Sequence, residues 1–580
     1  MFDGRFGMTA GSDGGPSPQF PEAGKKGATS NETPETSTGA EKINSGSLDE
    51  VTRRPLGHSV NNLLNISGIA ERDKTAAGEG KRVTDTYVLC RFVVVRGVAL
   101  IYLIAFLSLF LQVDGLFGKN GILPISQFME AVSGRYQFGE LPTVFWISSS
   151  DSFLKGACVG GMLSSLVAAA GILTGPALLL CWVLYLSFLT TGADFMSFQW
   201  DILLLETGIL AALWAPWAMA SPPLRNWTGT DGTPSRIVLW LLRWLLFRLM
   251  FMSGMCKLMS GDETWWSLTA LSYHYETQPL PTPVAWLCNM LPLWWQQLSC
   301  LLMFGIEIVS PFLIFGNRLT RRIAFGALAG LQILILLSGN YTFFNLLSIL
   351  LCFTLIDDSL WKRIFPVSLV DSLRNASAIT GTKWQLYQKV LVLPMVALLG
   401  LANLCMLNVQ ITGGEALPLP MREFWGNVRQ LHLVNSYGLF AVMTQKRIEI
   451  ILEGSNDGKE WLAYEFPFKP GDLKRPPPIV APLQPRLDWQ MWFAALGTVE
   501  GNPWFLSFAQ KILQGDKTVS ALLSKNPFPN APPIFLRAQS FEYHFTNAKE
   551  LMSTGNWWKR TYVGEYMPVA TLQNQLEQER

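Results

Sequence analysis

Three groups that can exchange protons occur close together in the sequence, at Lys257, His274 and Glu276. His274 and Glu276 are two residues apart in the stretch SYHYETQPLPTP, residues 272–283. Side chains of these types act as general acids and bases, so one hypothesis is an enzyme that works on a lipid or a peptide. The chain has only four histidines and no HExxH spacing, so we predict no metal site and no cofactor. The alternative is a loop that tyrosine and proline packing holds in place.

Aromatic and amide side chains around these groups extend the possible binding surface. Trp and Tyr combine a large apolar ring with a polar tip, which suits a membrane interface or the apolar segments of a partner protein. The candidate functional surface comprises Trp265, Trp266, Tyr273, His274, Tyr275, Glu276 and Gln278. The sequence leaves open whether this surface is a working or an architectural one.

Charged residues also stand inside long apolar runs. An ionisable group in hydrocarbon costs several kcal/mol unless it is paired, so such groups usually face the interior of a helix bundle. Arg243 and Glu206 lie on consecutive runs and can pair there, whereas Lys257, near the end of its run, best fits a side chain that reaches the membrane interface. A proton or ion path is the alternative. The candidates for intramembrane polar pairing are Asp201, Glu206, Arg243, Arg248 and Lys257.

The elements that position these residues are apolar segments of membrane-spanning length. Hydrophobic residues make up 49% of the 580 residues and charged residues only 15%, whereas a soluble globular protein carries about a quarter charged residues. Each segment is close to the roughly 20 residues that cross the hydrocarbon of a bilayer. The nine candidate spans are residues 92–113, 156–174, 176–192, 202–219, 237–258, 298–315, 323–338, 341–356 and 388–409. Tight turns leave open that 156–192 and 323–356 are single re-entrant units.

The distribution of Lys and Arg between the loops orients these spans. Loops 193–201, 259–297 and 338–340 carry neither residue, whereas loops 220–236, 316–322 and 357–387 on the other side carry at least two each. Because cytoplasmic loops are enriched in Lys and Arg, the pattern places the N-terminal tail inside the cytoplasm. It places residues 259–297 and 410–580 outside. Loop 114–155 is the exception, with three basic residues.

The predicted fold class is an α-helical polytopic membrane protein of about nine spans with a C-terminal extramembrane α+β domain. Residues 1–87 are rich in Gly, Ser, Thr, Pro and mixed charge, which predicts a disordered tail. Residues 88–409 form the predicted multi-span transmembrane helical domain and residues 410–580 the C-terminal domain. A net charge of +2 indicates no nucleic-acid partner.

The C-terminal region changes to a mixed α and β pattern. Residues 447–466 contain two strand-like runs joined by Asn-Asp-Gly, a hairpin signal, and residues 541–545 alternate like a further strand. Apolar spacing predicts helices over 488–499 and 504–523. All eight cysteines lie at or before residue 405, so this region has to rely on its own core rather than on disulfides.

Seven stretches resemble the lipase maturation factors. They occur in order over roughly residues 88–570, and the third is the most specific. The stretches are GLFGKNGILP (115–124), FQWDILLLETG (198–208), FRLMFMSGMCKLMSGDETWWSLTALSYHYETQPLPTP (247–283), SGNYTFFNLL (338–347), LHLVNSYGLF (431–440), RLDWQMWFAAL (486–496) and NPF (526–528).

The resemblance implies a multi-span membrane protein of the endoplasmic reticulum that assists the folding and assembly of secreted lipases without being an enzyme. It implies secretory clients and the lipid bilayer as partners, with the clients held by a lumenal C-terminal domain. The family's membrane half is distantly similar to that of the vitamin K-dependent carboxylases and their bacterial relatives. The alternative is therefore a membrane-embedded enzyme acting on a lipid or peptide at the outer membrane face, with the bacterial inner membrane as the alternative location. Animal members carry cysteines in the lumenal domain and this chain has none there, so a thiol redox role is not supported.

Overall fold

Long apolar helices account for most of the chain between residues 88 and 412. The computed structural model describes residues 86–217, 233–378, 390, 392–414 and 416–572. The predicted disordered tail therefore lies outside the described residues, apart from its last two positions.

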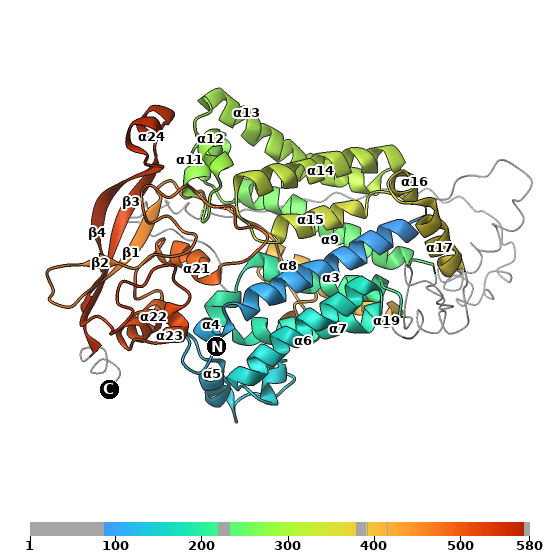
Figure 1. Ribbon diagram of the computed structural model, residues 1–580. Coiled ribbons are helices and arrows are strands. Elements are labelled where there is room, and N and C mark those ends of the chain that lie inside the picture. Colours follow the sequence, from blue (N-terminus) through green and yellow to red (C-terminus); the bar gives the residue numbers. More distant parts are fainter. Residues whose placement is uncertain (1–85, 218–232, 379–389, 391, 415, 573–580) are drawn as a thin grey trace, which may run out of the picture. The chain divides into compact units, whose positions relative to one another are not determined.

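Among the described residues, seven helical segments are long and apolar enough to cross a membrane, which confirms a polytopic helical membrane protein. Helices α3, α6 and α7 run side by side, as do α14 and α15 (Figure 1). The seven segments are α3 (Val88–Phe110), α6 (Asp151–Ala170), α7 (Thr174–Thr191), α9 (Arg236–Met259), Leu293–Phe315, α14 (Arg318–Ser338) and α19 (Leu393–Thr412).

The predicted number of nine spans is not confirmed. The candidate span 202–219 corresponds to α8 (Gln199–Trp214), which has 16 residues. The candidate span 341–356 corresponds to α15 (Phe344–Phe353), which has only 10. Both are shorter than the roughly 17–25 residues that a membrane-spanning helix needs.

The segment Leu293–Phe315 changes its helical winding part of the way along. It consists of α13 (Leu293–Phe304), the π-helical η3 (Gly305–Val309) and the 3-10 helical η4 (Ser310–Phe315). Pro311 has no backbone N–H and its ring disturbs the preceding turn, so regular α-helical bonding cannot continue past it. Glu307, in the widened turn, is buried.

Short elements connect these helices. The stretch 272–283 is not a plain loop, because it begins inside α11 and reaches α12 through an extended stretch with Pro at its end. The side chain of Thr282 accepts a hydrogen bond from the backbone N–H of Ala285, and Pro283 occupies the first helical position, as is typical of a helix start. The short helices are α4 (Val113–Phe117), α5 (Ile125–Val132), α10 (Glu263–Trp266), α11 (Ala270–Thr277), α12 (Pro283–Asn289), α16 (Asp358–Trp361), α17 (Val367–Ala378) and α20 (Leu419–Val428).

The C-terminal region contains one antiparallel sheet in the order β2-β1-β3-β4. The strands are β1 (Ile448–Ser455), β2 (Leu462–Ala463), β3 (Phe535–Phe545) and β4 (Trp558–Ala570). The predicted hairpin is confirmed, since β1 pairs with β2 around Gly458, whose φ is 72°. The predicted strand 541–545 is the second half of β3. Strand β3 pairs antiparallel with β1, and Ser540 of β3 lies opposite Ile450 of β1.

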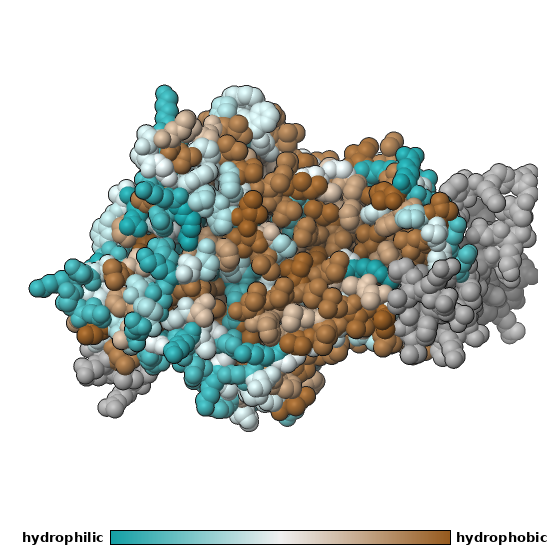
Figure 2. Space-filling view, in the orientation of Figure 1, coloured by the Kyte–Doolittle hydropathy of each residue, from teal (hydrophilic) through white to brown (hydrophobic). Residues whose placement is uncertain are grey.

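Helices pack beside this sheet and complete the C-terminal region. The predicted helix 488–499 forms as α21 (Arg486–Ala494). The predicted helix 504–523 divides into α22 (Pro503–Leu513) and α23 (Lys517–Ser520), because Gly515 between them has a φ of 70°. The last helix is α24 (Ala548–Thr554). Figure 2 shows apolar residues over the long helices and hydrophilic residues gathered over the region of the sheet.

Candidate functional site

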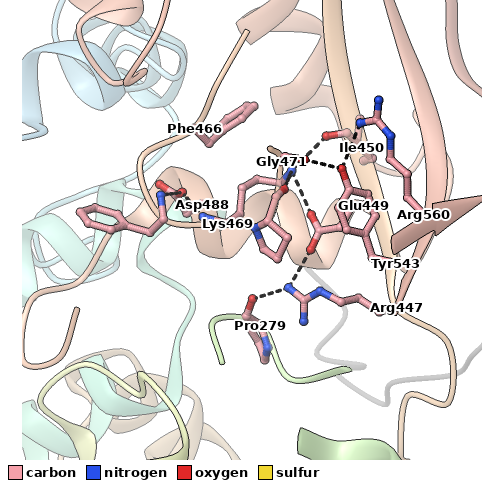
Figure 3. Close-up of polar contacts among 12 residues, drawn as sticks. Pro279, Arg447, Glu449, Ile450, Phe466, Lys469, Gly471, Asp488, Tyr543 and Arg560 are labelled. Carbon is pink, nitrogen blue, oxygen red and sulfur yellow. Dashed lines mark hydrogen bonds and ion pairs between the residues drawn. The ribbon is translucent and has the colours of Figure 1, made fainter. Parts of the chain in front are cut away.

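The stretch 272–283 is tied to the C-terminal region by a buried arginine. The Arg447 guanidinium donates to the backbone carbonyl oxygens of Glu276 at 2.7 Å, Gln278 at 2.5 Å and Pro279 at 2.9 Å. The last carbonyl groups of a helix have no hydrogen-bond donor within the helix. At the end of α11 the donor is Arg447, the residue before β1. Figure 3 shows Arg447 directed at Pro279 on one side and at Glu449 on the other. We call residues 272–286, together with the C-terminal residues that they contact, the junction.

A second cation completes a buried charge network behind Arg447. Glu449 of β1 lies 2.7 Å from Arg447 and 2.9 Å from the Lys469 ammonium. Lys469 also donates to the carbonyl of Ile450 at 3.1 Å, and its backbone N–H donates to Asp488 at 2.8 Å (Figure 3). Burial raises the pKa of Asp488 to about 6. These charges face one another away from water, where a lost partner is costly.

Glu276 points to the sheet rather than to His274. Its carboxylate accepts from Nδ1 of His544 at 2.7 Å and from the backbone N–H of Phe545 at 2.8 Å. Two further bonds join the same surfaces. Trp492 Nε1 donates to the carbonyl of Thr277 at 2.8 Å, and Trp286 Nε1 donates to the carbonyl of Thr546 at 2.7 Å.

His274 belongs to a separate chain of hydrogen bonds. The Tyr341 hydroxyl donates to Oε1 of Gln278 at 2.9 Å, so it accepts from Nε2 of His274 at 3.1 Å. The imidazole packs edge-on against Phe440, with ring centroids 4.8 Å apart. Burial lowers the pKa of His274 to about 4, and the charge of Lys257 acts in the same direction, so the ring is neutral at pH 7. His274 and Glu276 therefore have different partners and do not form an acid–base pair.

Lys257 does not extend to the membrane interface, contrary to the interpretation from its position in the sequence. Its ammonium forms an ion pair with Glu307 at 2.7 Å and donates to the carbonyl of Ser253 at 2.9 Å. The widened turn of η3 places Glu307 beside Lys257. Because the ammonium is already paired with a buried carboxylate, extending the side chain to the membrane interface would gain little free energy.

The predicted pairing of Arg243 with Glu206 is wrong. Glu206 forms its ion pair with Arg248, further along α9. Arg243 instead donates through Nη2 to the carbonyl of Thr354 at 2.8 Å, immediately after the end of α15. A helix C-terminus carries unpaired carbonyls and partial negative charge, so it satisfies a cation without a carboxylate.

The C-terminal region supplies further partners for the charges of α8. The Tyr437 hydroxyl donates to Glu206 at 2.7 Å and the backbone N–H of Asn435 does so at 2.9 Å. Asp201 accepts two bonds of 3.0 Å from the guanidinium of Arg486, which opens α21. Asp201 and Glu206 are therefore paired inside the protein, with partners from the C-terminal region as well as from the long helices.

Most of the candidate functional surface is internal. Trp265 and Gln278 are buried, and Tyr273 packs into a small apolar cluster that includes Trp265. Tyr275 is half-buried, and burial raises its pKa to about 12. Trp266 is 65% exposed and is the member that presents its ring to the surroundings. The residues of the candidate functional surface therefore mainly connect the helical and C-terminal regions and form little open surface.

The partners on the C-terminal side were hard to predict from the sequence. Arg447 lies 169 residues from Gln278, and Arg486 lies 285 residues from Asp201. One local signal existed: Glu449 is flanked by isoleucines in a strand-like run, and a charge among apolar strand residues needs a buried partner.

A cavity of about 340 Å³ lies over the sheet. Glu465 and Asp472 contribute carboxylates to its lining, while Lys474 and Arg560 contribute cations. Because both signs of charge line it, the cavity favours no particular ionic ligand.

Comparison with known proteins covers both the helical and the C-terminal regions. A family model described as "Lipase maturation factor transmembrane domain" matches residues 89–363. A second, described as "Lipase maturation factor C-terminal domain", matches residues 433–568. No solved structure matches the chain.

Several curated proteins are similar over most of their length. Lipase maturation factor 2 of Homo sapiens is 36% identical over 589 aligned positions, which cover 83% of each chain. Lipase maturation factor 2 of Rattus norvegicus is 37% identical, with 82% of each chain covered. Lipase maturation factor 1 of Bos taurus is 33% identical, with 84% of this chain and 90% of the bovine protein covered.

Proposed function

Because this chain belongs to the lipase maturation factor family, we propose that it is a membrane-bound maturation factor that assists the folding and assembly of secreted lipases. The observation that carries the proposal is the match of both family models together with relatives that cover more than four fifths of the chain. The clients are secretory proteins, with lipases as the class that the relatives' names indicate.

The proposed location is the endoplasmic reticulum membrane, with residues 410–580 in the lumen. The Lys/Arg asymmetry of the loops supports this orientation. The contacts of the junction support it too, because residues 276–279 and the sheet share hydrogen bonds and therefore lie on the same side of the membrane. In this arrangement the seven long helices cross the bilayer. The α8 and α15 helices have to cross it as well for residues 259–297 and 410–580 to lie outside, although each is shorter than a usual span.

The junction has a defined task in this proposal. A region that binds partly folded clients has to stay in contact with the membrane helices while a bound client exerts force on it. Buried charges fix it at two places, through Arg447 beside the end of α11 and through Arg486 on Asp201. Clients themselves meet the outer surface of residues 410–580, where exposed apolar side chains such as Ile479, Ile534 and Met552 are available.

The alternative of a membrane-embedded enzyme is not supported. Both family models and the curated relatives are described as maturation factors. The geometry adds to this, since the Glu276 carboxylate is occupied by His544 and Phe545, and Lys257 is paired with Glu307.

The proposal is tested by replacement in cells that lack their own lipase maturation factors. We expect this chain to raise the activity of a secreted lipase per unit of lipase protein, measured in the medium. A secreted protein that is not a lipase is the control, and its yield is expected not to change. Unchanged lipase activity, with this chain present at normal level in the endoplasmic reticulum membrane, would contradict the proposal.

A further inference from the structure

Helix α19 is the least enclosed of the seven long segments. Only 22% of its most apolar stretch is buried, whereas the corresponding fraction in the other six is 28–61%. Its buried side carries residues such as Ala402 and Met406. On the opposite side, Leu404 is 62% exposed and Ile411 is 81% exposed. One side of α19 is therefore left open by the described part of the chain.

The residues on this open side recur at spacings of four, three, four and three, which is the spacing of side chains that face one neighbouring helix. Small residues let two helices approach closely in a membrane, and the first half of α19 supplies them at Ala397 and at the adjoining Gly400. A Cβ atom added to Gly400 would meet no atom within 4 Å. We call the set the α19 seam; it consists of Ala397, Leu401, Leu404, Asn408 and Ile411.

Asn408 places an amide group on this open side. The 20 residues of α19 rise about 30 Å, which matches the hydrocarbon thickness, and Asn408 lies only about 8 Å from the middle of the helix. Its Oδ1 accepts from the Thr412 hydroxyl at 3.0 Å. Among the described residues, no acceptor is bonded to its amide nitrogen. Two N–H groups without an acceptor are costly in hydrocarbon.

The second asparagine of α19 shows how such an amide is satisfied within one copy of the chain. The amide nitrogen of Asn403 donates to the carbonyl of Leu399 at 2.8 Å, and its Oδ1 accepts from Nε1 of Trp244 at 2.8 Å. Asn403 lies on the buried side of α19, whereas Asn408 lies on the open side. Acyl chains offer no acceptor at this depth, so the open side of α19 fits a protein partner better than lipid.

A second copy of α19 supplies the missing acceptor. Two copies in one membrane have the same orientation, so a twofold axis along the membrane normal sets each residue of the α19 seam beside itself. An asparagine amide has both a donor and an acceptor, so two facing Asn408 side chains complement each other. A different protein would need its own amide at this depth. We propose that the α19 seam joins two copies of this chain into a parallel dimer, in which the Asn408 side chains are hydrogen-bonded to each other.

Oxidative cross-linking of the full-length protein in its membrane tests the proposed dimer. In a parallel pair, a cysteine at Leu404 faces the same position of the second copy, so Leu404→Cys is expected to give a disulfide-linked product of twice the mass. Leu334→Cys on α14 is the matched control, because Leu334 is 64% exposed but lies outside the α19 seam. We expect it to stay monomeric. The wild-type protein gives the background from native cysteines.

Two results of the cross-linking would overturn the proposal. Equal dimer yields for Leu404→Cys and Leu334→Cys would show chance collisions rather than a defined pair. A Leu404→Cys product of a different mass would assign the α19 seam to another membrane protein. Both experiments are carried out without a client, so their outcome does not depend on the proposed function in lipase maturation.

Substitutions of Asn408 test the hydrogen bond itself. The purified protein is reconstituted in phospholipid vesicles at increasing dilution with lipid, and copies per complex are counted by single-molecule photobleaching. Asn408→Leu is expected to weaken dimerisation about tenfold. Asn408→Gln keeps both a donor and an acceptor and is expected to retain most of it. Wild-type protein that is monomeric at every dilution, or Asn408→Leu that dimerises as tightly as wild type, would overturn the proposal.

Discussion

Arg447 makes three of the hydrogen bonds that hold the junction together. Its guanidinium serves three carbonyls of residues 276–279 and one carboxylate, all shielded from water. Arg447→Met therefore leaves carbonyls without donors and Glu449 with Lys469 as its remaining cation. Loss of one partner from a buried ion pair typically costs about 3–5 kcal/mol. We expect a clear fall in the thermal midpoint of the purified protein and in its level in the membrane.

The neighbouring strand β3 offers a matched control for this substitution. Arg537 pairs with Glu453 at 2.8 Å, but both side chains are partly exposed to solvent. A pair of this kind contributes about 0–1 kcal/mol, so Arg537→Met is expected to lower the thermal midpoint little. Equal losses for the two variants would show that the position of Arg447 at the junction has no special role.

The buried imidazole of His274 makes stability depend on pH. Its folded pKa is about 4, below the ordinary 6.5, so the unfolded chain binds more protons between about pH 6.5 and 4. Stability is therefore lost as pH falls through this window, by about 2 kcal/mol at pH 5. Asp488 opposes this, because its raised pKa of about 6 makes the folded state bind protons first.

A comparison of His274→Gln with the wild-type protein isolates the histidine. Gln does not titrate, so the variant is expected to lose less thermal stability than the wild type between pH 7 and pH 5. Thermal midpoints in detergent at the two pH values measure the difference. An identical pH dependence in both proteins would mean that His274 is already accessible to protons in the folded state.

At the scale of elements, one buried ion pair joins α8 to α21, beside the packing of Trp200 on Trp489. Asp201 and Arg486 are fully buried and joined by two hydrogen bonds, to which the Tyr185 hydroxyl adds a third. Arg486→Met leaves a buried carboxylate unpaired and is expected to destabilise the protein by about 3–5 kcal/mol. Adding Asp201→Asn removes that charge and is expected to restore much of the loss. Thermal midpoints of the two single variants and the double variant check this, and purely additive effects would contradict it.

Elements were predictable from the sequence where a local pattern sets them. Apolar runs of span length predicted α3, α9 and α14, and Asn-Asp-Gly predicted the β1–β2 hairpin, since both signals lie within one element. Helix length was less predictable: 341–356 gave only the 10 residues of α15, because the sequence does not show where a helix ends against its neighbours.

The partners of buried charges were not predictable in the same way. Arg248 and Arg243 lie on the same helix, and their neighbours on other elements decide which of them reaches Glu206. Arg486 is 285 residues from Asp201, so only the folded arrangement brings them together. A single sequence shows that a buried charge needs a partner, but it does not show which residue supplies that partner.

At the scale of the whole molecule, the charge pattern favours one orientation, and the junction keeps residues 276–279 on the same side of the membrane as the sheet. The hairpin tip between β1 and β2 is exposed at Lys459, and residue Arg363 is exposed on the basic side of the helices. If residues 410–580 are lumenal, a cysteine at Lys459 is protected in sealed microsomes, whose outer face is cytoplasmic. A cysteine at Arg363 is accessible there. We therefore expect an impermeant maleimide to label Arg363→Cys before permeabilisation and Lys459→Cys only afterwards.

The background for this labelling is small for a structural reason. Six of the eight native cysteines are buried, and the other two, Cys256 and Cys288, are partly buried. Wild-type protein treated in parallel gives the correction for these two. Labelling of Lys459→Cys in sealed microsomes would reverse the orientation and place the sheet in the cytoplasm. Residues 276–279 would then have to lie there as well, because Arg447 and Glu276 hold them against the sheet.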